Sequence, residues 1–146
     1  MFYTSENYPY DWLSPQDDNL WNAGTESNPV KTEYDPCPEG WRVPTYAELD
    51  NLNNHYSSWT TDDNGQIGYW FSGLSSYSSS SQKVFLPGAG FRGGSSGGAD
   101  LRGDNGSYWS SGPDILYSDF LGFYSGNVGM RSYERAYGRS VRCVQE

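Results

Sequence analysis

The chain has 146 residues, a net charge of −9 at pH 7 and an aromatic content of 17%. This length fits one domain with a hydrophobic core of its own, and the aromatic content argues against disorder, because disordered chains are poor in aromatic residues. No apolar run approaches the ~20 residues of a membrane-spanning helix, so we expect no direct membrane insertion.

The acidic charge is concentrated in the first part of the chain. Residues 1–63 contain 12 Asp/Glu and 2 Lys/Arg, a net of −10, whereas residues 64–146 contain 6 and 7, a net of +1. Because neither part is basic, we expect no binding to nucleic acid. No signal peptide is visible after Met1, which favours an excised domain of a longer parent protein or a mature form with an added Met.

Residues 1–36 are predicted to be irregular, since Pro, Asn, Asp and Ser recur too often for long helices or strands. Apolar side chains are expected to hold this segment against the rest of the domain, namely Trp12, Leu13, Leu20 and Trp21. The segment is therefore expected to pack as part of the same domain.

The strongest local pattern is a helix start at Thr45. Thr45 and Glu48 form a capping box, in which each side chain can accept a hydrogen bond from the other residue's backbone N–H. Leu49 and Leu52 are three residues apart and share one helix face. The pattern predicts a helix over about 46–54.

The rest of the chain predicts short strands between loops. Residues 57–82 are polar and Ser-rich, with a turn at 62–65 and with Trp70 and Phe71 as anchors. Glycines recur over 88–98, which favours turns and close backbone approach. Strands are predicted at 83–86, 107–111, 119–124, 127–131 and 139–144. A helix followed by short strands predicts an α+β fold with an antiparallel sheet.

Cys37 and Cys143 are the only cysteines, and no cluster of metal ligands surrounds them in the sequence. They form either a disulfide, which would tie the C-terminal strand to the segment before the helix, or a pair of buried free thiols. We favour the disulfide, which in the chain-entropy model is worth ~4.7 kcal/mol for a loop of about 100 residues. A disulfide implies an exported protein, extracellular or at the cell surface.

Four motifs occur in order along the chain: DPCPEGWRVPTYAELDNL at 35–52, FLPGAGFRGG at 85–94, GSYWSS at 106–111 and YGRSVRCV at 137–144. Together they resemble the Fibrobacter succinogenes major paralogous domain, which is common in surface proteins of Bacteroidetes-type bacteria. The resemblance implies a C-type-lectin-like fold, similar also to the formylglycine-generating-enzyme family, over a single domain of residues 1–146. It implies no catalysis, because both cysteines occupy the positions of the family's structural pair.

A second resemblance concerns the C-terminal region 106–144. It looks like the variable region of proteins diversified by retroelements, in which template adenines are randomised during reverse transcription. Replacing the adenines of an AAC codon reaches many residues found here, although Glu134 falls outside that set. The positions that fit are Asp114, Ile115, Leu116, Tyr117, Asp119, Phe120, Gly122, Tyr124, Gly129, Arg131, Ser132 and Tyr133.

This resemblance implies a ligand-binding face at about 112–135. Strand alternation assigns Leu121 and Phe123 to the core, and Phe120 and Tyr124 to the exposed set. Exposed aromatic and Arg side chains are typical of recognition surfaces. The predicted ligand-binding residues are Asp114, Ile115, Leu116, Tyr117, Asp119, Phe120, Tyr124, Arg131, Ser132, Tyr133 and Glu134, with Asp114, Asp119, Arg131 and Glu134 setting charge selectivity.

The tryptophans outside this set are interpreted as packing residues. Trp109 lies within the GSYWSS motif and is predicted to be a buried anchor, as are Trp41 and Trp70. Tyr108 fits either the core or the ligand face.

No catalytic or metal-binding set is recognised in the sequence. His55 is the only histidine and has no nucleophile motif near it, while Glu48 and Asp50 are explained as helix-start residues and not as a glycosidase pair. Calcium ligation by an EF-hand spacing or by EPN-, QPD- or WND-like tripeptides is not indicated. We therefore expect no enzymatic activity, no cofactor and no metal.

These patterns predict a non-enzymatic recognition domain of an exported bacterial or phage-associated surface protein, with a protein or cell-surface ligand as its partner. The alternative is a structural module of a surface lipoprotein or pilus-tip protein. Assembly would use frame residues such as Trp12 and Trp21, whereas recognition would use residues within 114–134.

Overall fold

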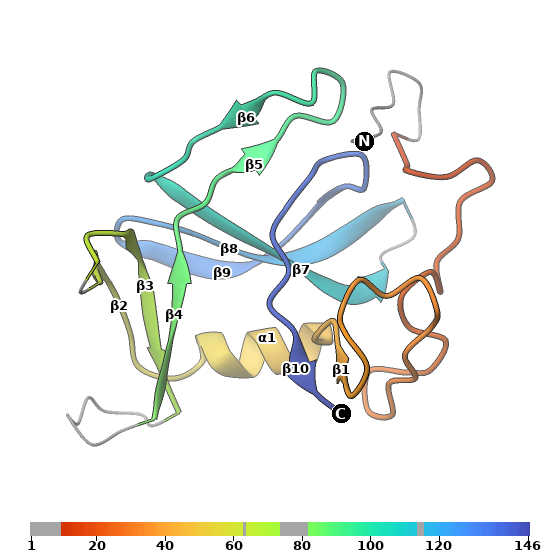
Figure 1. Ribbon diagram of the computed structural model, residues 1–146, viewed down its shortest axis with the longest axis horizontal. Helices are drawn as coiled ribbons and strands as arrows, with labels where there is room; N and C mark the ends of the chain where they lie inside the picture. Colours follow the sequence, from red (N-terminus) through yellow and green to blue (C-terminus); the bar gives the residue numbers. More distant parts are fainter. Residues whose placement is uncertain (1–9, 63, 74–81, 114–115) are drawn as a thin grey trace.

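The structure is a computed structural model, which describes residues 10–62, 64–73, 82–113 and 116–146 (Figure 1). Within these ranges the elements follow in the order β1 (Trp41–Arg42), α1 (Tyr46–Asn53), β2 (Ser57–Thr61), β3 (Ile67–Ser72), β4 (Lys83–Pro87), β5 (Phe91–Arg92), β6 (Ala99–Asp100), β7 (Asn105–Pro113), β8 (Tyr117–Tyr124), β9 (Asn127–Glu134) and β10 (Val144–Gln145). One short helix and mostly antiparallel strands in the described ranges are compatible with the predicted α+β class.

The central sheet has the order β7-β8-β9, and both neighbouring pairs are antiparallel. β8 and β9 pair residue for residue from Tyr117↔Glu134 to Tyr124↔Asn127. The pairing of β7 with β8 is interrupted between Trp109 and Pro113. In Figure 1, α1 lies below this sheet and the β5–β6 hairpin lies above it. The two faces of the sheet therefore meet different parts of the chain.

The hydrophobic core lies between α1, the central sheet and the neighbouring sheet β2-β3-β4. Its buried members are Leu49, Tyr69, Phe71, Leu86, Tyr108, Leu121 and Phe123. Leu121 and Phe123 are both 0% exposed, which confirms their predicted place in the core. The Phe123 ring contacts the rings of Tyr69 and Tyr108, with centroid distances of 5.2 and 5.9 Å. Aromatic rings thus supply much of the buried area in a chain that has few aliphatic residues.

Two strands in the region 57–82 were not predicted. The polar composition of this region favoured loops, yet β2 and β3 pair antiparallel from Ser57↔Phe71 to Thr61↔Ile67. The apolar residues of β3 face the core, where Tyr69 and Phe71 are buried. Trp70 is half-buried on the other face of the strand, where Lys83 Nζ lies 4.9 Å from its ring centroid. Tertiary burial of one face therefore outweighs the polar local composition.

Helix α1 begins as predicted. Thr45 is the N-cap, its Oγ1 accepts from Glu48 N–H at 3.3 Å, and Glu48 Oε2 accepts from Thr45 N–H at 2.9 Å. Arg42 adds a bidentate contact to the Glu48 carboxylate at 2.6 and 2.7 Å. The Arg42 guanidinium and the Thr45 backbone both hold the pKa of Glu48 below its usual value, against the opposing effect of burial. The helix start is thereby fixed to β1.

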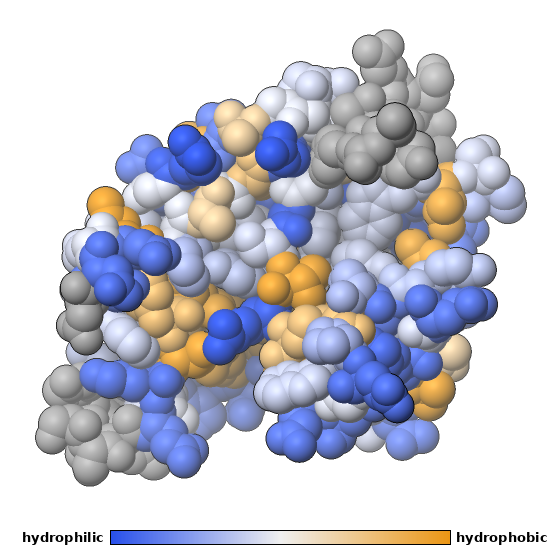
Figure 2. Space-filling model, in the orientation of Figure 1, coloured by the Kyte–Doolittle hydropathy of each residue, from blue (hydrophilic) through white to orange (hydrophobic). Residues whose placement is uncertain are grey.

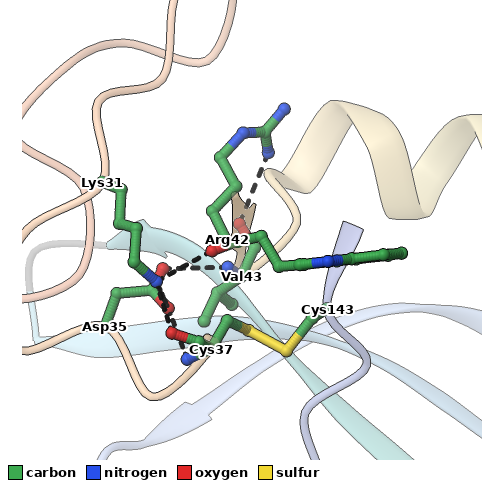
Figure 3. Close-up of a disulfide and its surroundings, with 7 residues drawn as sticks. Lys31, Asp35, Cys37, Arg42, Val43 and Cys143 are labelled. Atoms are coloured by element: carbon green, nitrogen blue, oxygen red, sulfur yellow. Dashed lines mark hydrogen bonds and ion pairs between the residues drawn. A yellow bond between two sulfur atoms is a disulfide. The ribbon is translucent and has the colours of Figure 1, made fainter. Parts of the chain in front are cut away.

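The disulfide between Cys37 and Cys143 is present, as favoured from the sequence, and it closes a separation of 106 residues. Figure 3 shows the buried carboxylate of Asp35 beside it. Asp35 accepts from the backbone N–H groups of Cys37 and Val43 at 2.7 and 2.9 Å. Lys31 Nζ donates to Asp35 at 3.0 Å and to the Cys37 carbonyl at 2.6 Å. This network orders the backbone on which the disulfide is mounted.

The described part of the N-terminal segment, residues 10–36, is irregular apart from one bridge, Asn22↔Lys31. Trp12 packs on Trp21 at 5.1 Å and against the edge of Trp109 at 5.9 Å between centroids. These contacts agree with the predicted packing of the segment. Leu13 differs from the expectation, because its side chain is exposed.

Two further expectations need correction. The predicted strand 139–144 is reduced to a bridge between Tyr108 and Ser140 and to β10, which pairs with β1. Trp41, predicted to be buried, is 43% exposed because β1 belongs to a two-stranded sheet at the surface. There it borders an apolar groove of about 350 Å³ over α1. Figure 2 shows apolar surface in this region, between β4 and β10.

Among the described residues, no helix has the length and apolar character needed to cross a membrane.

Candidate ligand-binding site

Alternation along β8 and β9 divides the predicted ligand-binding residues between the two faces of the sheet. Phe120 and Tyr124 on β8 point to the face opposite Leu121 and Phe123. Phe120 pairs with Arg131 on β9, so Arg131 lies on the same face. The neighbouring pairs Tyr117↔Glu134 and Asp119↔Ser132 belong to the other parity and lie at one end of the strand pair.

Four of the predicted residues line one pocket of about 450 Å³. They are Phe120, Tyr124, Arg131 and Tyr133, and we call this hollow the aromatic pocket. It is also lined by residues of the β5–β6 region, of β7 and of the C-terminal segment, including Phe91, Ser95, Ser96, Asp100, Asn105, Tyr137 and Arg139. A hollow of this size is within the range of small-molecule sites.

The other predicted residues do not line the aromatic pocket. Tyr117 is exposed, and Leu116, Asp119 and Glu134 are half-buried, while Ser132 is exposed. Asp114 and Ile115 lie outside the described residues. The predicted face is therefore split, and only part of it forms a concave site.

The sequence predicted Phe120 to be an exposed contact residue, and this prediction is wrong. Its side chain is only 6% exposed, although strand alternation places it on the pocket face. The edge of Trp109 packs against it at 5.7 Å, and the Arg139 guanidinium covers it with 3.6 Å to the ring centroid. Phe120 is thus the floor of the aromatic pocket. Tyr124, which is 45% exposed, has the exposure that was predicted for it.

Arg139 is the central residue of the site, and the sequence did not single it out. Its guanidinium lies within 6 Å of five ring centroids, from every strand of the central sheet, from β5 and from the C-terminal segment. The distances are 3.6 Å to Phe120, 4.9 Å to Trp109, 5.5 Å to Phe91, 5.6 Å to Tyr137 and 5.7 Å to Tyr133. Ring faces are electron-rich and attract a cation, more strongly when water is excluded.

Burial disfavours the positive charge on Arg139, because the guanidinium loses contact with water. Burial lowers its pKa to about 10, so the side chain remains protonated at neutral pH. Nη1 donates to Ser107 Oγ, but the buried Nε has no hydrogen-bond partner in the described structure. Burial and a hydrogen bond to Tyr133 raise the pKa of Tyr137, so the Tyr137 phenol beside the guanidinium carries no negative charge near pH 7. Among the described residues, aromatic rings and no carboxylate stabilise this cation.

Tyr124, Arg131 and Tyr133 are exposed and form the outer rim of the pocket. The Arg131 guanidinium lies 5.7 Å from the Tyr124 ring centroid, and its Nη2 donates to Asn127 Oδ1. Gly122 makes room for this side chain, because a Cβ at position 122 would lie 2.8 Å from Arg131 Cδ. The rim therefore presents one exposed cation and two exposed rings on a paired strand ladder.

A buried ion pair fixes the far end of the strand pair to the N-terminal segment. Arg135 is 4% exposed and contacts Asp11 at 3.3 Å and Asp18 at 2.7 Å. Its Nε also donates to the Tyr117 carbonyl at 3.0 Å. The hydrogen bond from Arg135 lowers the pKa of Asp18. No signal in the sequence paired Arg135 with Asp11 or Asp18, which lie more than 100 positions away, so this contact was missed.

His55 and Glu48, the candidate catalytic residues, each interact with neighbouring residues at the ends of α1. His55 Nδ1 contacts the Asn51 carbonyl at 2.7 Å at the helix end, and Glu48 is bound by Arg42 and Thr45. Within the part of the chain that the structure describes, no group of three or more His, Cys, Asp or Glu residues could hold a metal ion.

No protein-family model, curated protein or solved structure matches this chain. The geometry of the aromatic pocket is therefore the basis for a functional hypothesis.

Proposed function

We propose that this chain is a non-enzymatic recognition domain that binds a protein or cell-surface ligand through the rim of the aromatic pocket. The observation that carries this proposal is the placement of Tyr124, Arg131 and Tyr133. All three are exposed, surround a hollow of about 450 Å³ and stand on strands whose backbones are paired. Exposed Tyr and Arg on a rigid support offer contact area with little side-chain entropy to lose.

The wider proposal is a C-type-lectin-like domain of an exported surface protein, related to the Fibrobacter succinogenes major paralogous domain and diversified by a retroelement. The disulfide supports export, because disulfides persist in oxidising compartments. The paired β8–β9 backbone supports diversification, since its hydrogen bonds do not depend on the side chains at the rim. Residues outside the aromatic pocket, such as Tyr117 and Glu134, would extend the contact surface.

The assembly-module alternative has less support in the structure. Trp12 and Trp21, which assembly would use, pack on each other and Trp12 also contacts Trp109. These rings already serve the packing of the N-terminal segment.

Binding is best tested with a matched pair of triple variants. Tyr124→Ser, Arg131→Ser and Tyr133→Ser together remove the rim, while Tyr34→Ser, Tyr46→Ser and Arg142→Ser remove the same residue types from exposed sites elsewhere. Both proteins and the wild type would be applied to arrays of bacterial surface proteins and surface glycans. We expect the rim variant alone to lose the wild-type binding pattern. Equal loss in both variants, or retention in the rim variant, would contradict the proposal.

Diversification is tested by sequencing clones of the gene region from one population. We expect substitutions at adenine positions within 112–135, with 35–52 and 139–144 unchanged. If residues 112–135 are invariant among the clones, the retroelement part of the proposal is wrong. Binding through the rim would still be tested by the triple variants.

A further inference from the structure

A second hollow, of about 380 Å³, borders the β5–β6 hairpin and shares Phe91 and Arg139 with the aromatic pocket. Three arginines line it, Arg92, Arg102 and Arg139, together with the hydroxyl-bearing Ser140. Its remaining lining residues are Ala89, Gly90, Phe91, Ala99 and Gly138, so no carboxylate faces it among the described residues. We call this hollow the arginine pocket.

The composition of the arginine pocket is opposite to that of the chain. The protein has 18 acidic and 9 basic residues, yet this hollow collects three of the nine basic ones and no acidic one. Figure 2 shows hydrophilic residues interspersed with apolar ones over the β5–β6 hairpin, which forms one wall. Cations gathered without counter-charges repel one another, so a fold keeps them together at a cost unless an anion joins them.

None of the three guanidiniums is neutralised within the described structure. The ion pairs there involve Lys31, Arg42 and Arg135 instead. Within the described residues, the Arg92 guanidinium donates only to the Gly97 carbonyl, at 3.0 Å, and Arg102 is exposed. Arg139 gives the strongest indication of a missing anion, because it is desolvated and its Nε lacks a hydrogen-bond partner in the described structure.

The walls of the arginine pocket are held by backbone hydrogen bonds. Arg92 and Gly138 exchange both N–H···O bonds, at 2.7 and 3.0 Å. Gly90 has a φ of +73°, and a Cβ there would lie 2.0 Å from the Asp100 carbonyl, so only glycine allows this approach of the two hairpin arms. The Gly90 N–H donates to the Asn105 carbonyl at 2.7 Å, which ties the hairpin to β7. The hollow therefore exists before any ligand arrives.

We propose that the arginine pocket binds an oxyanion, the carboxylate or sulfate group of a ligand, between Arg92, Arg102 and Arg139. The planar guanidinium fork matches the oxygen spacing of these groups and can bind them through two parallel hydrogen bonds. Ser140 adds a neutral hydroxyl donor at the same hollow. This site goes beyond the proposed function and stands whether or not the rim of the aromatic pocket binds a ligand.

The test is an NMR titration of the ¹⁵N-labelled protein that follows the arginine Nε–Hε signals. Sodium sulfate and sodium acetate are added separately, each against sodium chloride at matched ionic strength. We expect saturable shifts at Arg92, Arg102 and Arg139 with one or both oxyanions, and none of that kind at Arg142, which lies outside the pocket. Saturation by sulfate alone, by acetate alone or by both would each support the site and would identify which group it prefers.

Arg102→Gln is the test variant, because Arg102 is exposed and donates no hydrogen bond in the described structure, so its loss should leave the fold intact. We expect it to weaken oxyanion binding about tenfold, as for the loss of one charge-assisted hydrogen bond. Arg142→Gln removes the same charge from an exposed site elsewhere and should leave the affinity unchanged. Shifts that grow linearly with salt, shifts as large at Arg142, or equal affinities in the two variants would overturn the proposal.

Discussion

The Arg139 guanidinium lies 3.6 Å from the centroid of the Phe120 ring and thereby joins the C-terminal segment to the middle strand of the central sheet. Trp109 on β7 and Tyr133 on β9 complete the contact from the two outer strands. One side chain thus touches all three strands of the sheet. It also lines both hollows, so the aromatic pocket and the arginine pocket depend on the same residue.

Replacing Arg139 with Ala should lower the free energy of unfolding by about 2–3 kcal/mol, because desolvated cation–π contacts and the packing of the stem are lost together. Urea unfolding monitored by tryptophan fluorescence would measure the change. Arg131→Ala is the control, since Arg131 is exposed and touches one ring, and it should stay within about 0.5 kcal/mol of wild type. Equal effects of the two variants would contradict a central role for Arg139.

Phe120 and Tyr124 should respond differently to truncation although they share a strand face. Phe120→Ala removes the buried floor of the aromatic pocket and is expected to cost about 3–5 kcal/mol of stability. Tyr124→Ala removes an exposed ring and should change stability by no more than about 0.5 kcal/mol. Thermal unfolding of the two variants would measure this; a small effect of Phe120→Ala would restore that residue to the exposed set.

Breaking the Arg135 ion pair should release the N-terminal segment. Arg135→Ala leaves the Asp11 carboxylate, whose side chain is 4% exposed, without its charged partner, at an expected cost of about 3–5 kcal/mol. Limited proteolysis should then cleave within residues 10–36 before the rest of the domain. Asp18→Asn is the control, because that side chain is 52% exposed and its loss is expected to cost about 1 kcal/mol or less. Unchanged cleavage in Arg135→Ala would show that Trp12 and Trp21 suffice to hold the segment.

The disulfide should contribute strongly to stability. The Cys37→Ser, Cys143→Ser double variant is expected to lose about 4–5 kcal/mol, because the bridge constrains an unfolded-state loop that spans 106 residues of sequence separation. Equilibrium denaturation of the variant and of the reduced wild type should agree. A loss below about 1 kcal/mol in both would mean that the Asp35 network orders this region without the bridge.

Acid should destabilise the fold through Glu48 and Asp18. The pKa of each carboxyl group is lowered in the folded protein, so the unfolded state binds more protons at low pH. Their stabilising contribution is therefore complete above the unfolded pKa values and is lost as the pH falls through the lower, folded values. Glu48→Gln should flatten the decline of stability below about pH 4.5, as measured by denaturation across pH. An unaltered slope would show that Glu48 contributes nothing to the acid response.

Local signals in the sequence were enough for some elements and not for others. The helix start, β4 and the strands near 107–131 were predicted because capping residues and strand alternation act over a few neighbouring positions. β2 and β3 were missed because their burial comes from distant parts of the chain, which local composition does not report.

The site was predicted only in part for the same reason. Tyr124, Arg131 and Tyr133 were identified by residue type and alternation. The position of Phe120 as a floor depends on Arg139, which is 19 residues further along the chain, and no spacing rule connects the two. The resemblance implied a ligand-binding face at 112–135, and this range does not include Arg139, the C-terminal residue that covers Phe120.

The uninterrupted β8–β9 ladder has a consequence for protein engineering. Eight residue pairs are joined through backbone atoms, while alternate side chains on one face reach solvent around a hollow. Positions 124 and 131 can therefore be randomised together to any residue except proline, which would remove a ladder donor, whereas position 133 also contacts Arg139. Such a library, presented in a display system, would vary the chemistry of a concave surface. The backbone geometry of the β8–β9 pair and the disulfide elsewhere in the domain would stay the same.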